Sequence, residues 1–278
     1  MDFDKFRQDV EKIQRDCWAQ VIRQYYNKLS QNQIKTKAHQ TDFQTIADVE
    51  SEKFLTQKLT QMLPGSLVLG EEAEAAGNVS LDIFTQAKKD ALIWVIDPID
   101  GTYNFVKGHD DFAIIIALVQ NNETIGGWIY KPKTDEVVSA IKGHGAFYNG
   151  VPCNTSAHDN GQLADLAGYS PLIYSSRAGV KDHFVKAAKS LQNVDNLRSS
   201  GVHYMNIAQG KADFYICHHS KPWDHVAGAF IVKEAGGMTT QWDQQDYKPS
   251  DNKALLITAN SAASHQALHG HFIKTIKP

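Results

Sequence analysis

Residues 92–102 have the sequence LIWVIDPIDGT, in which an apolar run leads directly into two aspartates around a proline. The run from Leu92 to Ile96 predicts a short strand that is buried on both faces. Pro98 cannot donate a hydrogen bond to a neighbouring strand, so we expect the backbone to leave the sheet there. Asp97 and Asp100 are three residues apart, and the tight turn between them aims both carboxylates at one point.

This pair of carboxylates predicts a metal site. Two carboxylates held so close raise each other's pKa unless a cation lies between them. The motif offers oxygen ligands and no His or Cys at ligand spacing, which favours a hard ion such as Mg²⁺ over zinc or copper. Gly101 and Thr102 follow, and a helix that began there would present free N–H groups to a phosphate beside the metal. Asp, Pro and Gly also favour turns for local reasons, so the motif alone is equally compatible with a simple turn.

Two further acidic motifs take similar positions in the predicted elements. Glu71-Glu72 follows a predicted strand from Ser66 to Gly70, and Asp224 lies at the start of a predicted helix. In isolation the glutamates are typical of a solvated pair and the aspartate of a helix cap. Their joint occurrence with the first motif indicates one site where metals hold a phosphate, Thr102 orients a water molecule and Asp48 accepts a proton.

The rest of the chain alternates between predicted helices and strands. Apolar residues at spacings of three and four predict helices from Phe3 to about Asn27, Thr45 to Met62, Lys181 to Leu191, Ser199 to Ala208, Asp224 to Glu234 and Ala262 to Ile276. Short apolar runs bounded by turns predict further strands at Phe112 to Val119, Thr124 to Tyr130, Val137 to Ile141, Ala212 to Cys217, Met238 to Gln241 and Ala254 to Thr258. The mixture indicates an α+β fold rather than a doubly wound parallel sheet.

The polar stretch from Cys153 to Gly161 is the best boundary within the chain. We therefore expect an N-terminal α+β half, residues 1–150, that carries most metal ligands. The C-terminal half, residues 151–278, would carry Asp224 and the residues of the substrate pocket. The 278 residues contain no internal repeat, so the length allows one large domain or two intimately packed ones. We expect the two halves to pack as one globular unit.

The composition argues against several classes of protein. Hydrophobic residues make up 42% of the chain, enough for a substantial core, whereas the longest apolar run, residues 112–119, is too short to span a membrane. The 28 Lys+Arg and 31 Asp+Glu give a net charge of −3 without a basic cluster, so nucleic-acid binding is not expected. The start of the chain lacks a secretory signal, which favours a cytoplasmic protein. The three cysteines, Cys17, Cys153 and Cys217, match neither a disulfide framework nor a zinc motif.

The sequence resembles the inositol monophosphatase family of Mg²⁺-dependent, lithium-sensitive phosphomonoesterases. The match lies in Gly70-Glu71-Glu72, in residues 94–105 and in residues 223–228 with 233–237, and looser similarity extends over nearly the whole chain. The resemblance implies a layered α-β-α-β-α sandwich that usually forms a homodimer.

The resemblance also implies two to three Mg²⁺ ions with particular ligands. Glu71, Asp97 and the carbonyl of Ile99 would hold the first ion. Asp97, Asp100 and Asp224 would hold the second, and Glu71 would face a third, looser ion.

The resemblance also implies which residues bind the attacking water and the phosphate. Thr102 and Asp48 would hold the attacking water, with Glu71 as the third catalytic residue, and the backbone of Gly101 and Thr102 would cradle the phosphate. The residues predicted to contact phosphate or substrate are Asp100, Gly101, Thr102, Gly201, His203 and Cys217.

Three positions depart from the family pattern, and all three concern the substrate. Animal relatives have a glutamate that binds an inositol hydroxyl seven residues before the last metal-binding aspartate, whereas this chain has Cys217. His203 stands where a small residue is common, and Tyr103 replaces a more frequent threonine. Every metal ligand is kept, so we expect catalysis, while recognition of a sugar or polyol stays open. Cys217 is also compatible with a small apolar residue at the end of a strand.

These features predict a Mg²⁺-dependent phosphatase that hydrolyses a small phosphate monoester by attack of a metal-activated water, without a phosphoenzyme. The leading substrate is myo-inositol 1-phosphate or a related polyol or sugar phosphate. Histidinol phosphate, fructose 1,6-bisphosphate and 3′-phosphoadenosine 5′-phosphate, the substrates of relatives with the same motifs, stay open. A regulatory role through protein contacts, with the fold retained, is the alternative from a different class.

Overall fold

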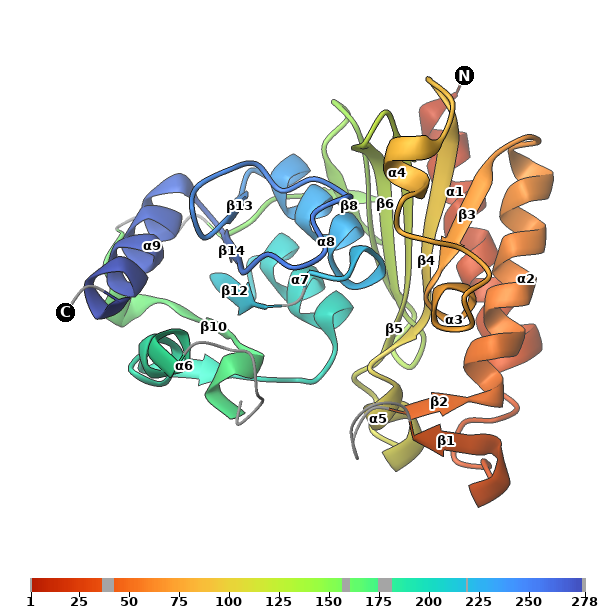
Figure 1. The fold of residues 1–278 in the computed structure, drawn as a ribbon, viewed down its shortest axis with the longest axis horizontal. Coiled ribbons are helices and arrows are strands. Elements are labelled where there is room, and N and C mark those ends of the chain that lie inside the picture. The colour runs from red at the N-terminus through yellow and green to blue at the C-terminus, as the bar shows by residue number, and fades with distance from the viewer. Residues whose placement is uncertain (1, 37–42, 157–160, 175–181, 219, 277–278) are drawn as a thin grey trace.

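The computed structural model describes residues 2–36, 43–156, 161–174, 182–218 and 220–276. Two β-sheets face each other across a central helical layer, and further helices cover the outer face of each sheet (Figure 1). Three clusters of buried apolar residues fill the spaces between these layers. The predicted α+β class and the α-β-α-β-α sandwich are therefore confirmed.

The larger sheet of the described residues has the strand order β3-β4-β5-β6-β7-β8-β9. Its strands are β3 (Leu67–Gly70), β4 (Leu92–Asp100), β5 (Ala113–Gln120), β6 (Glu123–Lys131), β7 (Glu136–Ile141), β8 (Ala146–Tyr148) and β9 (Val151–Cys153). β3 and β4 are parallel, and every later pair is antiparallel. The three strands predicted at Phe112 to Val119, Thr124 to Tyr130 and Val137 to Ile141 are observed as β5, β6 and β7, which form an antiparallel meander. The division of the chain at residue 150 stays a prediction.

The smaller sheet has the order β11-β10-β12-β14-β13 among the described residues. Its strands are β10 (Ala167–Tyr169), β11 (Asn193–Asp195), β12 (Phe214–Cys217), β13 (Met238–Gln241) and β14 (Leu256–Ala259). A separate hairpin joins β1 (Ile34–Thr36) to β2 (Phe43–Thr45).

The helices form the other layers of the sandwich. α1 (Phe3–Cys17) and α2 (Ile46–Met62) cover the outer face of the larger sheet, and α6 (Asp182–Lys189) and α9 (Ala262–Ile276) cover the smaller one (Figure 1). α7 (Ser200–Ala208) and α8 (Pro222–Glu234) lie between the sheets (Figure 1). The short helices are α3 (Glu71–Ala75), α4 (Ile83–Gln86) and α5 (Thr102–Lys107). No helix among the described residues has both the length and the apolar character needed to cross a membrane.

Two local expectations were wrong. The first helix does not continue regularly to Asn27, because a π-helical turn, Trp18–Ile22, follows α1 and Asn27 has a φ of +59°. Strand β4 does not end at Ile96 but runs to Asp100, because its register against β5 shifts between Asp97 and Asp100. Proline has no backbone N–H to donate to the neighbouring strand, and the irregular pairing at this point accommodates Pro98.

Candidate active site

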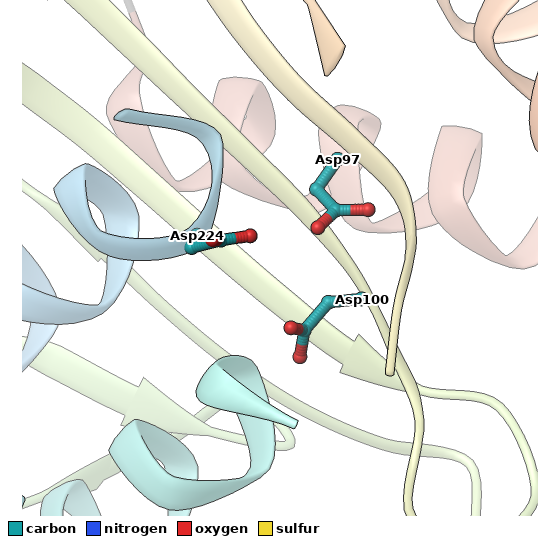
Figure 2. A group of neighbouring side chains, drawn as sticks. All are labelled: Asp97, Asp100 and Asp224. Atoms are coloured by element: carbon teal, nitrogen blue, oxygen red, sulfur yellow. The ribbon is translucent and has the colours of Figure 1, made fainter. Parts of the chain in front are cut away.

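Three buried or half-buried aspartates meet at the end of strand β4. Asp97 and Asp100 come from this strand, and Asp224 comes from the first turn of α8. One carboxylate oxygen from each residue lies within 4.8 Å of the other two. Figure 2 shows the three side chains around a common centre, two from β4 and one from α8. The predicted convergence of the two sequence motifs is therefore observed.

The electrostatics of this group fit a divalent cation. Burial raises the pKa of Asp97 and of Asp224 well above the usual value, and the nearby charge of Glu71 raises both further. Burial also raises the pKa of Asp100 to about 6. Carboxylates that repel one another in a buried position favour a positive charge between them, and an all-oxygen donor set suits Mg²⁺. We call Glu71, Asp97, Asp100 and Asp224 the acidic floor.

The carboxylate of Asp100 is oriented by the N-terminus of α7. Its oxygens accept hydrogen bonds from the Ser199 hydroxyl at 2.5 Å, the Gly201 N–H at 2.8 Å and the Ser200 N–H at 3.1 Å. A Cβ on Gly201 would lie 3.1 Å from Asp100 Oδ2, so the glycine permits this close approach. Gly201, predicted to contact phosphate or substrate, thus contacts a floor residue directly.

Thr102 and Asp48 lie next to each other beside the floor, as predicted. The Thr102 hydroxyl donates to the carbonyl of Ile99 at 3.0 Å and lies 3.4 Å from Asp48 Oδ1. Asp48 Oδ2 accepts the N–H and hydroxyl of Thr45 at 2.7 and 2.6 Å. Burial raises the pKa of Asp48 to about 7 despite these hydrogen bonds. Gly101, with a φ of +85°, immediately precedes α5, so a helix begins at Thr102 as expected.

Side chains from the smaller sheet and the central helices form the opposite side of the site. Cys217 Sγ lies 3.6 Å from His225 Nδ1, which is 3.1 Å from the Tyr204 hydroxyl. Burial lowers the pKa of His203 and of His225 to about 3, and it raises the pKa values of Cys217 and Tyr215. These groups are therefore uncharged at neutral pH. We call His203, Tyr215, Cys217 and His225 the neutral wall.

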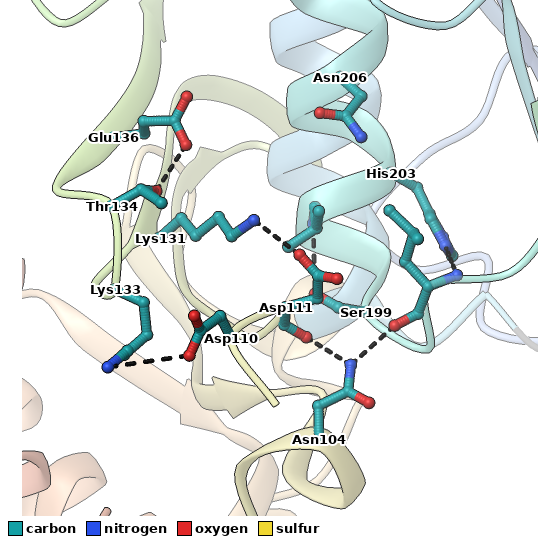
Figure 3. Close-up of polar contacts among 12 residues, drawn as sticks. Asn104, Asp110, Asp111, Lys131, Lys133, Thr134, Glu136, Ser199, His203 and Asn206 are labelled. Carbon is teal, nitrogen blue, oxygen red and sulfur yellow. Dashed lines mark hydrogen bonds and ion pairs between the residues drawn. The ribbon is translucent and has the colours of Figure 1, made fainter. Parts of the chain in front are cut away.

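One segment beside the neutral wall is held by a pair of hydrogen bonds that sequence reasoning missed. His203 Nε2 accepts the N–H of Leu197 at 2.9 Å, so the proton of the neutral ring sits on Nδ1. The Leu197 carbonyl accepts from Asn104 Nδ2 at 2.7 Å, and the same amide donates to the backbone carbonyl of Asp111 (Figure 3). The guanidinium of Arg198 then lies 4.6 Å above the ring of Tyr103.

The floor and the wall enclose one pocket of about 530 Å³. Most of the predicted site residues line it, whereas Asp48 and Gly201 lie behind and contact Thr102 and Asp100. Tyr215 and Lys221 also line the pocket and were not predicted, because each is an isolated residue outside a motif. Arg198 and His218 line it as well. The predicted residues on the pocket lining are Glu71, Asp97, Ile99, Asp100, Gly101, Thr102, His203, Cys217 and Asp224.

Known proteins are similar to this chain over most or all of its length. The structure of the Thermotoga maritima IMPase is 26% identical and superposes with a TM-score of 0.80, covering 100% of this chain and 99% of that chain. The inositol-1-monophosphatase of Bacillus subtilis is 28% identical over 268 residues, 96% of each protein. The Nus factor SuhB of Xylella fastidiosa is 30% identical and covers 88% of this chain and 86% of its own length.

The layered fold and the acidic floor define a phosphoric monoester hydrolase. The sequence model of the inositol monophosphatase family matches residues 5–277. The chain belongs to this family, whose members are metal-dependent phosphatases that act on small phosphate esters.

Proposed function

We propose that this protein is a Mg²⁺-dependent phosphatase that hydrolyses myo-inositol 1-phosphate or a related polyol or sugar phosphate. The observation that carries the proposal is the convergence of Asp97, Asp100 and Asp224 within a pocket large enough for such an ester. Oxygen donors from these residues, from Glu71 and from the Ile99 carbonyl would hold two to three ions. Membership of the inositol monophosphatase family supports the substrate class.

Bound Mg²⁺ would supply charge stabilisation for the phosphate and would make a water molecule easier to deprotonate. The protein's own part in the reaction is orientation and proton transfer. Thr102 and Asp48, whose oxygens lie 3.4 Å apart, would orient the attacking water, with Glu71 on the same side. Because burial raises the pKa of Asp48 to about 7, its carboxylate is suited to accept a proton near neutral pH.

The ester would lie between the floor and the neutral wall. The backbone N–H groups of Gly101 and Thr102, at the start of α5, would donate to the phosphate oxygens. The alcohol that leaves would face Cys217 and His203 on the wall. The uncharged wall suits an uncharged polyol. Arg198 and Lys221 line the same pocket and would be available to a second phosphate, so fructose 1,6-bisphosphate and a nucleotide bisphosphate stay among the alternatives.

Replacement of a floor residue tests the proposed function. We expect Asp97→Asn to lower Mg²⁺-dependent hydrolysis of myo-inositol 1-phosphate by about 10³-fold, because a shared ligand is lost. Asp9→Asn is a matched control, since Asp9 is an exposed residue of α1 that pairs with Lys5. Equal rates for Asp97→Asn and the parent protein would contradict the metal assignment. A panel with histidinol phosphate, fructose 1,6-bisphosphate and 3′-phosphoadenosine 5′-phosphate tests the substrate.

A regulatory role is the second candidate function, favoured by the likeness to a relative named as a Nus factor. Such a role would act through protein contacts and would not need the acidic floor. A stoichiometric protein that copurifies equally with the parent and with Asp97→Asn would support it. Loss of the same partner in Asp97→Asn would tie the contact to the catalytic site instead. A homodimer, a cytoplasmic location and inhibition by lithium belong to the proposal and are checked by sedimentation, fractionation and a Li⁺ titration.

A further inference from the structure

The inner face of α2 carries two buried carboxylates that are one helical turn apart. Asp48, in the first turn, contacts Thr102, as described above. Glu52 is four residues further on, so its side chain lies on the same face. Glu52 is 7% exposed and is not among the residues that line the pocket. The proposed reaction so far gives Glu52 no part.

Glu52 binds the first turn of α3, the short helix that begins with Glu71. Glu52 Oε2 accepts the N–H of Glu72 at 2.7 Å, and Oε1 accepts the N–H of Ala73 at 2.8 Å. The first N–H groups of a helix have no partners within that helix, and a carboxylate there is favoured by both hydrogen bonding and the helix dipole. Both oxygens of one rigid group therefore fix the backbone directly after Glu71.

The residue before Glu71 is shaped for the same contact. Gly70 has φ and ψ of −105° and 151°, which any residue can adopt, so its backbone conformation does not require a glycine. The glycine is needed for steric reasons instead, because a Cβ at residue 70 would lie 2.2 Å from Glu52 Cδ. A larger residue would push the carboxylate away from the two N–H groups. Gly70 and Glu52 thus form a matched pair around the start of α3.

The sheet explains why this backbone position matters for the metal site. β3 is parallel to β4, with Gly70 paired to Ile96. The next residues along the chain are Glu71, at the start of α3, and Asp97, still within β4, so the two residues lie side by side. The charge of Glu71 is close enough to raise the pKa values of both Asp97 and Asp224. A small movement of the start of α3 would carry Glu71 away from the other floor carboxylates.

We propose that Glu52 is a positioning residue that sets Glu71 in place for binding of the divalent cation. The inference rests on the proposed metal site and adds a residue to it that touches neither metal nor substrate. Residues that orient metal ligands typically change metal affinity or activity by 10- to 100-fold when they are replaced. Glu52→Gln keeps the size of the side chain but removes its charge and replaces one acceptor by a donor, so one of the two hydrogen bonds is lost.

The test measures Mg²⁺ binding directly by titration calorimetry of the purified full-length protein, without substrate. We expect Glu52→Gln and Gly70→Ala each to raise the dissociation constant for Mg²⁺ by about 10-fold or more. Glu50→Gln is the matched control from the same helix, because Glu50 accepts a hydrogen bond from the Tyr25 hydroxyl at 2.7 Å. It should leave the constant unchanged. The same variants should need more Mg²⁺ for half-maximal phosphatase activity.

A double variant distinguishes a specific effect on the position of Glu71 from a general loss of structure. If both substitutions act by displacing one carboxylate, Glu52→Gln with Gly70→Ala should weaken Mg²⁺ binding no more than the stronger single change. Folded single variants with the parent's dissociation constant would overturn the inference while leaving the proposed function intact. A parent protein that binds no Mg²⁺ would overturn both. If Glu52→Gln does not fold, Gly70→Ala decides, because it moves the carboxylate without removing it.

Discussion

The acidic floor and the neutral wall face each other across one pocket, and burial disfavours the charged form of the titratable groups on both. The two sides differ because a cation can keep the carboxylates of the floor ionised, whereas nothing on the wall calls for a charge. Burial raises the pKa values of the floor aspartates, which repel one another until a cation lies between them. It removes the charge of the wall, where His203 and His225 have a pKa of about 3. The floor is therefore suited to bind metal and activate water. The wall is suited to accept whatever uncharged group the phosphate leaves behind.

The largest expected effect is the loss of catalytic rate when a carboxylate of the floor is replaced, which a change in the wall should not match. Asp224 is the floor residue supplied by the C-terminal part of the chain, next to His225 of the wall. We expect Asp224→Asn to lower the rate of phosphate release by about 10³-fold, because only the carboxylate can share a cation with Asp97 and Asp100. Steady-state kinetics with saturating Mg²⁺ check this. A loss smaller than that caused by a wall variant would show that the division into floor and wall is mistaken.

Without bound metal, the stability of the protein should depend on the protonation of the floor carboxylates and of Asp48. With EDTA, the folded protein binds more protons near neutral pH than the unfolded chain does, because the pKa of Asp48 is raised to about 7 and that of Asp100 to about 6. A carboxyl group whose pKa is raised by folding makes the protein more stable as the pH falls through that value. We expect the free energy of unfolding to rise between pH 8 and pH 6.5, by at most about 1.4 kcal/mol per pH unit for each group.

Urea unfolding followed by circular dichroism measures this dependence. Saturating Mg²⁺ should raise the free energy of unfolding at pH 8, by about 2.7 kcal/mol at a concentration 100 times the dissociation constant. It should also flatten the pH dependence, since the ion keeps the carboxylates ionised. The same slope with EDTA and with Mg²⁺ would mean that the floor does not bind the ion.

The wall should show the opposite pH dependence. His203 has a pKa of about 3 in the folded protein, whereas an unfolded histidine titrates near 6.5. A histidine whose pKa is lowered by folding contributes stability above pH 6.5 that is lost as the pH falls, because the unfolded chain takes up the proton first. We expect the parent protein to lose stability relative to His203→Gln between pH 6.5 and pH 4. The difference should reach about 1.4 kcal/mol per pH unit at most.

The glutamine offers an oxygen acceptor for the N–H of Leu197, so the fold around Arg198 should persist in this variant. Chemical denaturation of both proteins over this pH range gives the comparison. Parallel curves for the parent and His203→Gln would indicate that the imidazole is not desolvated as the structure implies. Stronger loss in the variant would indicate that the hydrogen bond from Leu197 needs the ring itself.

The sequence was sufficient to find the floor but not the groups that orient it. Asp97, Asp100 and Asp224 could be predicted because each stands at the end of a strand or start of a helix, which local patterns reveal. Glu52 is an ordinary polar residue in a helical pattern, and only the folded chain brings it to the N–H groups of Glu72 and Ala73.

The wall and its surroundings show the same limit. His203 was predicted to contact the substrate, and that role stays a prediction, but its hydrogen bond to Leu197 depends on a loop conformation that no local pattern determines. The hydrogen bond from Asn104 to Leu197 could not be predicted either, because the two residues are 93 positions apart in the chain. β10 and β11 have three residues each, too few for alternation to identify a strand. Long-range pairing, rather than local preference, creates these features.

The smallest expected effect concerns Cys217. Its thiol lies at the end of β12 and contacts His225, and burial and the charge of Asp224 raise its pKa, so the group stays neutral. Cys217→Ala removes one sulfur and its contacts, and we expect a stability loss of about 1 kcal/mol. With no charge removed, kcat/KM for myo-inositol 1-phosphate should change by less than about 5-fold, which corresponds to about 1 kcal/mol.

Kinetics and thermal unfolding of Cys217→Ala, compared with Cys153→Ala, check this expectation. Cys153 is a half-buried thiol of β9 that does not line the pocket. A loss of kcat/KM above about 30-fold, or about 2 kcal/mol, with KM raised and kcat unchanged would mean that the sulfur touches the ester itself. The wall would then select the substrate through Cys217 rather than through its lack of charge, and a serine at this position, with a stronger hydrogen-bonding group, should restore binding of a polyol hydroxyl.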